Sequence, residues 1–269
     1  MSIFDSIILG AIQGLAEFIP ISSSGHLIIA RDLFDWHSLS DLSFDAVLQL
    51  ATGFALVLYF WKDIVRLIKS FYNLILKREV AKDDKTLIFA IVIGTIPAII
   101  IGMLLEEYMD TIFRSALLVS IVLIIGSLVM FFAEKYSKKD KILTVKNGFL
   151  IGLFQCLALV PGFSRSGATI SGGLFVGLKR EDAARFSFLL SIPIILGSGS
   201  KKLIEIIQSG NSFVNGAPLF FGSVTSFVVG YFVIRFLMKY LKNNSLKPFI
   251  IYRLALAVFV LFFLFIGKI

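Results

Sequence analysis

Two polar side chains, Gln13 and Glu17, lie four residues apart in an otherwise apolar stretch near the N-terminus. Residues at this spacing share one face of a helix. An ionisable side chain inside a membrane helix costs about 2.5–3.5 kcal/mol on insertion scales, so a metal ion, a cationic partner or water must offset it. Both side chains supply oxygen ligands of the kind that Mg²⁺ and Ca²⁺ take. The alternative is an interfacial glutamate that reaches water near a helix end.

A serine-rich turn with a histidine follows Pro20. It consists of Ser22, Ser23, Ser24, Gly25 and His26. Serine is a preferred helix N-cap, and a helix that begins here exposes N–H groups that bind an anion. His26 is suited to act as a nucleophile or general acid–base near pH 7, and a serine beside it as an activated nucleophile. The alternative is a tight polar turn with a hydrogen-bonded histidine, while His37 is expected to lie in a loop.

A second break carries an arginine in an otherwise apolar segment. Its residues are Pro161, Gly162, Phe163, Ser164, Arg165, Ser166, Gly167, Ala168 and Thr169. A guanidinium between serines and glycines suits a phosphate, because it offers a bidentate fork and its neighbours offer further donors. The alternative is a structural ion pair between Arg165 and Glu17, and the two interpretations are compatible. The predicted phosphate-binding residues from both breaks are Ser22, Ser24, Gly25, Ser164, Ser166 and Gly167.

The composition of the 269-residue chain excludes a water-soluble domain. Hydrophobic residues make up 57%, charged residues only 16%, and the mean hydropathy is +0.91, whereas soluble domains carry about 25% charged residues. The net charge of +8 fits basic loops on the cytoplasmic side of a membrane better than nucleic-acid binding. We therefore predict an all-α polytopic membrane protein with one membrane domain, residues 1–269. No Lys or Arg precedes Arg31, so we expect no cleaved signal peptide.

Six stretches are long and apolar enough to cross a membrane. They are residues 44–62, 86–105, 114–133, 184–200, 217–237 and 249–267. Basic connectors at 62–85, 134–146 and 235–247 give a consistent alternation when all three lie in the cytoplasm. Two further apolar stretches, 3–31 and 147–178, are interrupted by the polar breaks. Irregular backbone at membrane depth survives only inside protein or beside a watery cavity, so we predict two re-entrant helical hairpins, the first entering from outside and the second from the cytoplasm.

The two interrupted stretches match each other at a constant offset in the sequence. The matched pairs are Gly10 with Gly152, Gln13 with Gln155, Ser22 with Ser164, Ser24 with Ser166, and Gly25 with Gly167. At a smaller offset, Gly94 matches Gly222. We predict internal repeats at about 1–136 and 146–269, each with one hairpin and three spans. An odd number of spans inverts one copy in the membrane, and inverted repeats with broken helices put a binding site near the midplane.

The two motifs resemble the signatures of a known family. The run from Gln13 to Pro20, continuing into the serine-rich turn, resembles the first signature of the bacterial undecaprenyl-diphosphate phosphatases of the bacitracin-resistance type. The run from Pro161 to Ala168 resembles the second, and the resemblance covers the whole chain in length, span count and motif spacing. It implies hydrolysis of undecaprenyl diphosphate to undecaprenyl phosphate and inorganic phosphate, which recycles the lipid carrier for cell-wall synthesis and confers bacitracin resistance.

The resemblance also implies roles for single residues. The family's essential serine, histidine and arginine fall on Ser23, His26 and Arg165, which together with Glu17 form the predicted catalytic set; whether Ser23 or His26 is the nucleophile stays open. A divalent metal, Mg²⁺ or Ca²⁺, is implied, with Gln13 and Glu17 as ligands. Gln13 is the glutamine variant of the signature, which leaves one carboxylate instead of two. The implied location is the bacterial inner membrane, with the active site open to the outer leaflet and with a homodimer left open.

Other classes of membrane protein fit these residues less well. Type-2 phosphatidic-acid phosphatases also have a Ser-Gly-His stretch, but they need Ser-Arg followed after five residues by histidine, and Ser171 stands there. A lipid-phosphate transporter would use the same arginine and is the main alternative. Ser23 and His26 favour the enzyme, because transport needs neither a nucleophile nor a base. A purely structural membrane protein leaves Glu17, His26 and Arg165 unexplained.

Overall fold

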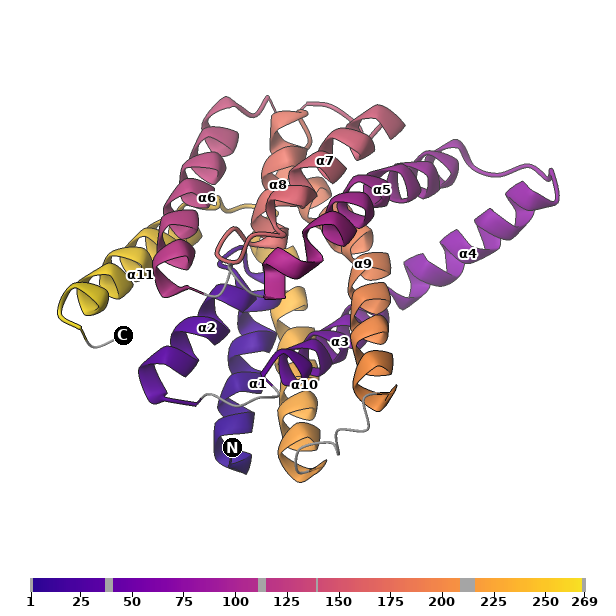
Figure 1. Ribbon diagram of the computed structural model, residues 1–269. Helices are drawn as coiled ribbons and strands as arrows, with labels where there is room; N and C mark the ends of the chain where they lie inside the picture. The colour runs from indigo at the N-terminus through magenta and orange to yellow at the C-terminus, as the bar shows by residue number, and fades with distance from the viewer. Residues whose placement is uncertain (1, 37–40, 111–114, 139, 209–215, 268–269) are drawn as a thin grey trace.

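The computed structural model describes the chain except for residues 1, 37–40, 111–114, 139, 209–215 and 268–269, so His37 lies outside it. The described part consists of eleven α-helices and contains no strand, as the all-α prediction requires (Figure 1). In chain order the helices are α1 (Ile3–Phe18), α2 (Ser23–Phe34), α3 (Asp41–Tyr59), α4 (Trp61–Ile75), α5 (Lys82–Asp110), α6 (Ala116–Tyr136), α7 (Val145–Leu157), α8 (Arg165–Phe175), α9 (Arg180–Gln208), α10 (Gly216–Tyr240) and α11 (Lys247–Phe265).

Five helices of the described residues are long and apolar enough to cross a membrane. They are α5, α6, α9, α10 and α11, and each contains most of one predicted span. The sixth predicted span, 44–62, corresponds to α3, which reaches the required length only together with α4. Many of the exposed side chains on these helices are large and apolar, for example Phe232 and Val258, as lipid-facing surfaces require. The chain is a multi-pass, all-α membrane protein.

The first half of the predicted basic connector over 62–85 is helical. Residues 61–75 form the helix α4, which turns by 78° from α3 at a break after Tyr59. In α4 the exposed apolar side chains of Trp61, Ile68 and Ile75 recur at a helical spacing, with Lys62 and Lys69 between them. A basic segment whose apolar residues recur at a helical spacing forms an amphipathic helix instead of a loop. The number of charged residues alone does not show this spacing.

Each predicted hairpin is a pair of helices joined by a short break, and its re-entrant course in the membrane stays a prediction. The first consists of α1 and α2, and the second of α7 and α8. Their breaks meet in the interior, where the Gly162 N–H donates a hydrogen bond to Ser22 Oγ at 3.0 Å. Residues that are about 140 positions apart in the chain therefore form one continuous region (Figure 1).

Close glycine contacts pack each hairpin against a membrane span. A Cβ on Gly10 of α1 would overlap the carbonyl oxygen of Gly222 in α10, and a Cβ on Gly152 of α7 would overlap that of Gly94 in α5. Small residues let two helix backbones approach this closely. These four glycines are the ones that the two sequence offsets match. The division into repeats at 1–136 and 146–269 stays a prediction.

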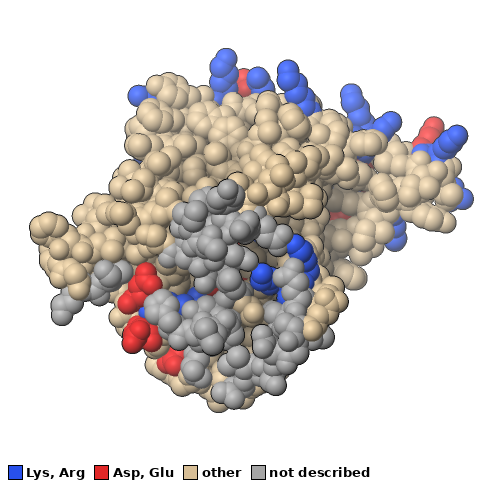
Figure 2. Space-filling view, in the orientation of Figure 1, with Lys and Arg blue, Asp and Glu red and all other residues tan. Residues whose placement is uncertain are grey.

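Charged side chains are unevenly distributed over the surface. Figure 2 shows Lys and Arg along the upper edge and at the right-hand tip, where Figure 1 places the α6–α7 and α4–α5 connections. The core below is apolar and includes Phe188, whose ring contacts those of Phe18 and Phe60 edge to face. One end of the molecule is thus basic, whereas the hairpin breaks lie in the interior of the molecule.

Candidate active site

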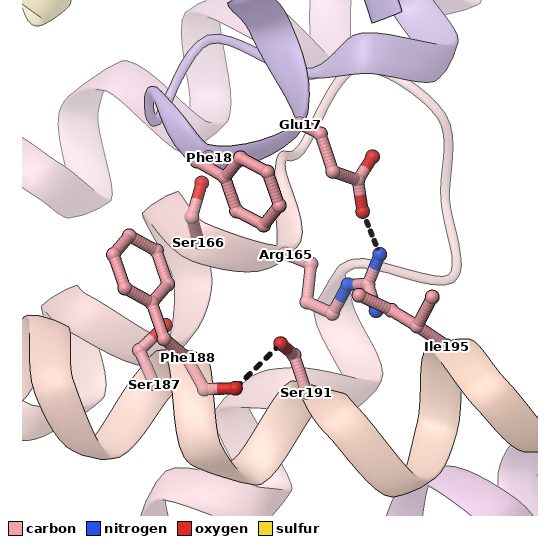
Figure 3. A pocket seen from close by; sticks show the side chains of 8 residues that line it. All are labelled: Glu17, Phe18, Arg165, Ser166, Ser187, Phe188, Ser191 and Ile195. Atoms are coloured by element: carbon pink, nitrogen blue, oxygen red, sulfur yellow. Dashed lines mark hydrogen bonds and ion pairs between the residues drawn. The ribbon is translucent and has the colours of Figure 1, made fainter. Parts of the chain in front are cut away.

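A buried carboxylate, that of Glu17, lies where the two hairpins meet. Glu17 Oε2 accepts hydrogen bonds from Gln13 Nε2 at 3.0 Å and from Ser23 Oγ at 2.6 Å. Glu17 Oε1 forms an ion pair with Arg165 Nη2 (Figure 3). The carboxylate is 2% exposed and the Arg165 side chain 15%. Side chains from α1, α2 and α8 therefore form one polar cluster in an otherwise apolar interior.

Local structure explains why these side chains converge. Gln13 and Glu17 share one face of α1, as their spacing predicts. Ser23 is the first residue of α2 and Arg165 the first of α8, so each follows directly on a helix N-cap. Each hairpin break therefore directs the residue after its cap toward Glu17. This residue is a serine in the first break and an arginine in the second.

The two N-cap residues, Ser22 and Ser164, have nearly the same backbone conformation. Their φ angles are 78° and 76°, a region that costs a residue with a Cβ about 1–3 kcal/mol. Ser22 Oγ accepts from Gly25 N–H at 3.3 Å, and Ser164 Oγ accepts from Gly167 N–H at 3.1 Å. Both hydroxyl oxygens, predicted to bind phosphate, therefore serve here as helix caps.

The remaining predicted phosphate-binding serines differ in their surroundings. Ser166 is buried and donates to the Ile19 carbonyl at 3.4 Å, so it links the second break to the first. Ser24 is exposed and lies 3.5 Å from Ser22 Oγ. Their role toward phosphate stays a prediction.

His26 belongs to a second group of contacts, beside the Glu17 cluster. Its Nδ1 lies 2.7 Å from the Ser22 carbonyl oxygen, and its Nε2 lies 2.8 Å from the hydroxyl of Tyr252 in α11. A carbonyl only accepts, so Nδ1 carries the hydrogen. Both ring nitrogens thus have partners other than Glu17, Ser23 or Arg165. Tyr252 is absent from the predicted site, because one tyrosine in an apolar span gives no distinctive signal.

Arg253, which follows Tyr252 in α11, bonds to both breaks. Its fully buried guanidinium donates to the carbonyls of Pro20, Gly162 and Phe163 at 3.3, 3.0 and 3.0 Å. It also bonds to the Leu123 carbonyl and the Ser127 hydroxyl of α6. This residue is missing from the predicted site too. A charged residue inside the apolar run 249–267 was a signal that could have found it.

A small cavity opens beside the Glu17–Arg165 pair, and α9 forms its far wall. Ser187, Ser191 and Ile195 recur every four residues on one face of α9 and line it together with Phe18 and Phe188 (Figure 3). Arg165 Nη1 is buried and has no hydrogen-bond partner in the described part of the chain. A buried N–H donor without an acceptor is costly, so this nitrogen is the one best placed to take a phosphate oxygen. The α9 serines carried no recognisable motif in the sequence.

The oxygen donors of the cluster fit a hard cation only as a partial ligand set. They are the Glu17 carboxylate, the Gln13 amide oxygen and the Ser23 hydroxyl. No group of three or more His, Cys, Asp or Glu side chains comes together among the residues described. Mg²⁺ is commonly held by one or two carboxylates while substrate phosphates and water complete its shell. The donor chemistry therefore fits a metal that binds together with a phosphorylated substrate.

Comparison with known proteins identifies the family. The sequence model of a family described as bacitracin resistance protein BacA matches residues 6–259. The chain is 43% identical to an undecaprenyl-diphosphatase of Geotalea daltonii over 99% of this chain and all of that protein. It is 42% identical to an undecaprenyl-diphosphatase of Chloroherpeton thalassium, over 100% and 99% of the two chains, and 40% identical to one of Thermobifida fusca, over 97% and 90%. The fold is that of a polytopic membrane protein with a buried polar cluster. The chain belongs to the BacA family, as the resemblance of its two motifs predicts.

Proposed function

We propose that this protein hydrolyses undecaprenyl diphosphate to undecaprenyl phosphate and inorganic phosphate, and so recycles the lipid carrier of cell-wall synthesis and confers bacitracin resistance. The meeting of Glu17, Ser23 and Arg165 inside a membrane protein carries the proposal. Phosphoryl transfer depends on positioning and charge stabilisation, and a hydroxyl bonded to a carboxylate supplies the nucleophile. Relatives named undecaprenyl-diphosphatase, similar over nearly the whole chain, support the choice of substrate.

Arg165 is the proposed phosphate ligand. Its Nη2 is held by Glu17, while its Nη1 has no partner among the described residues and borders the cavity. The guanidinium can therefore bind a phosphate oxygen through Nη1 without giving up the ion pair. The prenyl tail of the substrate is apolar and stays in lipid, so only the diphosphate head has to enter the region between the hairpin breaks.

Ser23 is the proposed nucleophile, and the 2.6 Å hydrogen bond from its hydroxyl to Glu17 supports this choice over His26. Ser23 Oγ attacks the terminal phosphorus and passes its proton to Glu17, and the bond to the bridging oxygen breaks to release undecaprenyl phosphate. Water then attacks the phosphoserine, the bond between phosphorus and Ser23 Oγ breaks as Glu17 returns its proton to that oxygen, and inorganic phosphate is released. His26, whose Nε2 bears the lone pair in the neutral ring, is the proposed base for that water.

A divalent cation is part of the proposal. Glu17, Gln13 and Ser23 would hold Mg²⁺ or Ca²⁺ together with oxygens of the substrate diphosphate. Such an ion supplies charge neutralisation at the phosphoryl group. Chelation should therefore abolish turnover and weaken binding of the diphosphate.

The test is phosphate release from undecaprenyl diphosphate by the detergent-purified protein, with Mg²⁺, with Ca²⁺ and with chelator. We expect metal-dependent release that is lost in Ser23→Ala. Ser198→Ala is the matched control, because Ser198 is an exposed serine of α9 that bonds to its own helix. Full release by Ser23→Ala would refute the nucleophile. No release from a wild-type protein that still binds the lipid would favour the transporter instead.

We also propose that the basic end lies on the cytoplasmic side of the bacterial inner membrane and that the substrate enters from the outer leaflet. The unequal distribution of Lys and Arg supports this orientation (Figure 2). A cysteine in place of Asp35 or Arg78, in a Cys156→Ala background, tests it with a membrane-impermeant thiol reagent on intact cells. Only the cysteine at position 35 should react, and the reverse pattern would invert the orientation. Light scattering of the purified protein tests the homodimer that the sequence left open.

A further inference from the structure

Helix α11 lies outside both motifs, yet it brings a side chain directly against His26. The Tyr252 hydroxyl is 2.8 Å from His26 Nε2, although the two residues are 226 positions apart. The two rings are nearly parallel, at 8°, and their centroids are 5.6 Å apart. The contact therefore combines a hydrogen bond with a stacked arrangement, which together define both the position and the plane of the imidazole.

The partners of the two ring nitrogens determine the tautomer of His26. The Ser22 carbonyl oxygen accepts from Nδ1 at 2.7 Å, which keeps the hydrogen on that nitrogen. In the neutral ring Nε2 then has the lone pair, and the Tyr252 hydroxyl donates to it. If the hydroxyl were absent, the Ser22 bond and the ring contact would remain, and Nε2 would lose the partner that fixes its direction.

The position of Tyr252 is itself set by its neighbour. Arg253 is fully buried and bonds to carbonyls of both breaks, including Pro20 and Gly162. These bonds hold α11 in one register against the first break, which leads directly into the first turn of α2 with His26. Tyr252 is 45% exposed, so its hydroxyl has room to move aside when water or substrate reaches Nε2.

We propose that Tyr252 is a positioning residue for His26, which it holds with Nε2 directed to accept a proton while the Ser22 carbonyl keeps the hydrogen on Nδ1. The inference rests on the proposed function, in which His26 activates water. Tyr252 itself stays outside the bond-making steps. Its loss should therefore lower kcat and leave KM nearly unchanged, since no phosphate contact is removed.

The experiment uses Tyr252→Phe, which keeps the ring and removes only the hydroxyl. The chain has two histidines, so a His37→Gln background with ¹⁵N-labelled histidine reports on His26 alone. We expect the Nδ1–H tautomer in both proteins, and a shifted Nε2 resonance in Tyr252→Phe, which has lost the hydrogen bond to this nitrogen. The expected fall in kcat is about 3- to 10-fold, the effect of one hydrogen bond.

Tyr240→Phe is the matched control, because it also removes one tyrosine hydrogen bond, to the Ser245 carbonyl, at the α10–α11 connection. An unchanged His26 spectrum in Tyr252→Phe would overturn the inference, whatever happens to kcat. A changed spectrum with unchanged kcat would overturn it as well. His26→Gln separates the two levels of the proposal. Its full activity would remove His26 from the proposed reaction, whereas an inactive His26→Gln beside a normal Tyr252→Phe would refute only the positioning role.

Discussion

The two hairpin breaks have nearly the same backbone and opposite chemical roles. In each, a serine with positive φ caps a short helix and accepts a hydrogen bond from a glycine three residues later. The residue after the cap is Ser23 in the first break and Arg165 in the second. Where the first break has Glu17 and His26, the equivalent positions of the second carry Leu159 and Ala168. One backbone conformation thus presents the proposed nucleophile from one side and the proposed phosphate ligand from the other.

The comparison indicates that the shared backbone of the two breaks sets the geometry, while individual side chains set the chemistry. Gln13 and Gln155 illustrate it on the helices before the breaks. Gln13 donates to Glu17 four residues later. Gln155 is equally buried, but Leu159 stands four residues later, and neither amide atom of Gln155 has a partner in the described structure. Four sets of substitutions test how the two breaks differ and how they are joined.

The largest effect should come from making the second break resemble the first. Arg165→Ser, like Arg165→Ala and Glu17→Ala, removes half of the central ion pair. We expect kcat to fall by at least about 10²- to 10³-fold, as when a key donor to a developing charge is lost. Arg165→Lys should restore little, because an ammonium lacks the planar fork. Phosphate release measures the effect, and gel filtration checks folding. Normal turnover in Arg165→Ala would refute the site.

The next effect concerns the residue that joins the breaks. Arg253→Met leaves buried carbonyls of Pro20, Gly162 and Phe163 without their donor. Each unpaired buried acceptor costs about 1–3 kcal/mol, so we expect a loss of at least about 3 kcal/mol of unfolding free energy. Thermal unfolding in detergent measures it. Arg235→Met, an exposed arginine of α10, should change stability by less than about 0.5 kcal/mol. Equal midpoints for both variants would contradict this role.

A smaller effect should distinguish the two caps. Ser22→Ala and Ser164→Ala each remove an N-cap, which costs about 0.5–2 kcal/mol. Ser22 Oγ also accepts from Gly162 N–H in the other break, so Ser22→Ala should be the more destabilising of the two. Parallel urea or thermal unfolding of the two variants gives the comparison. A larger loss for Ser164→Ala would show that the contact between the breaks contributes little.

The smallest effects should come from the two glutamines on the helices before the breaks. One substitution should be neutral or stabilising, and the other should slow phosphate release. Gln155→Leu replaces a buried amide that lacks partners, so stability should stay the same or rise by up to about 1–3 kcal/mol. Gln13→Leu removes a donor to Glu17 and should slow phosphate release by about 10-fold, the value of one charged hydrogen bond. The two measurements are a melting curve and a rate. Destabilisation by Gln155→Leu would mean that its amide is satisfied after all.

Much of the architecture could be predicted because membrane solvation constrains it strongly. Long apolar runs indicate the spans, and polar interruptions at Ser22 and Ser164 indicate the breaks, since lipid tolerates neither charge nor unpaired backbone. The helix α4 was missed because its charges resemble those of a loop unless their period is examined. The candidate site was predicted only in part. Glu17, Ser23 and Arg165 come together, whereas Tyr252, Arg253 and the α9 serines carry no local motif.

The sequence by itself determined the class of protein, the two breaks and the residue types that they present. These features are local, because hydropathy, capping and helical spacing each depend on neighbours within a few residues. Only the tertiary structure decided which side chains meet. The contact of His26 with Tyr252 and the bond of Arg253 to the Pro20 carbonyl join residues more than two hundred positions apart. Such contacts depend on how whole helices pack, and no short stretch of sequence encodes them.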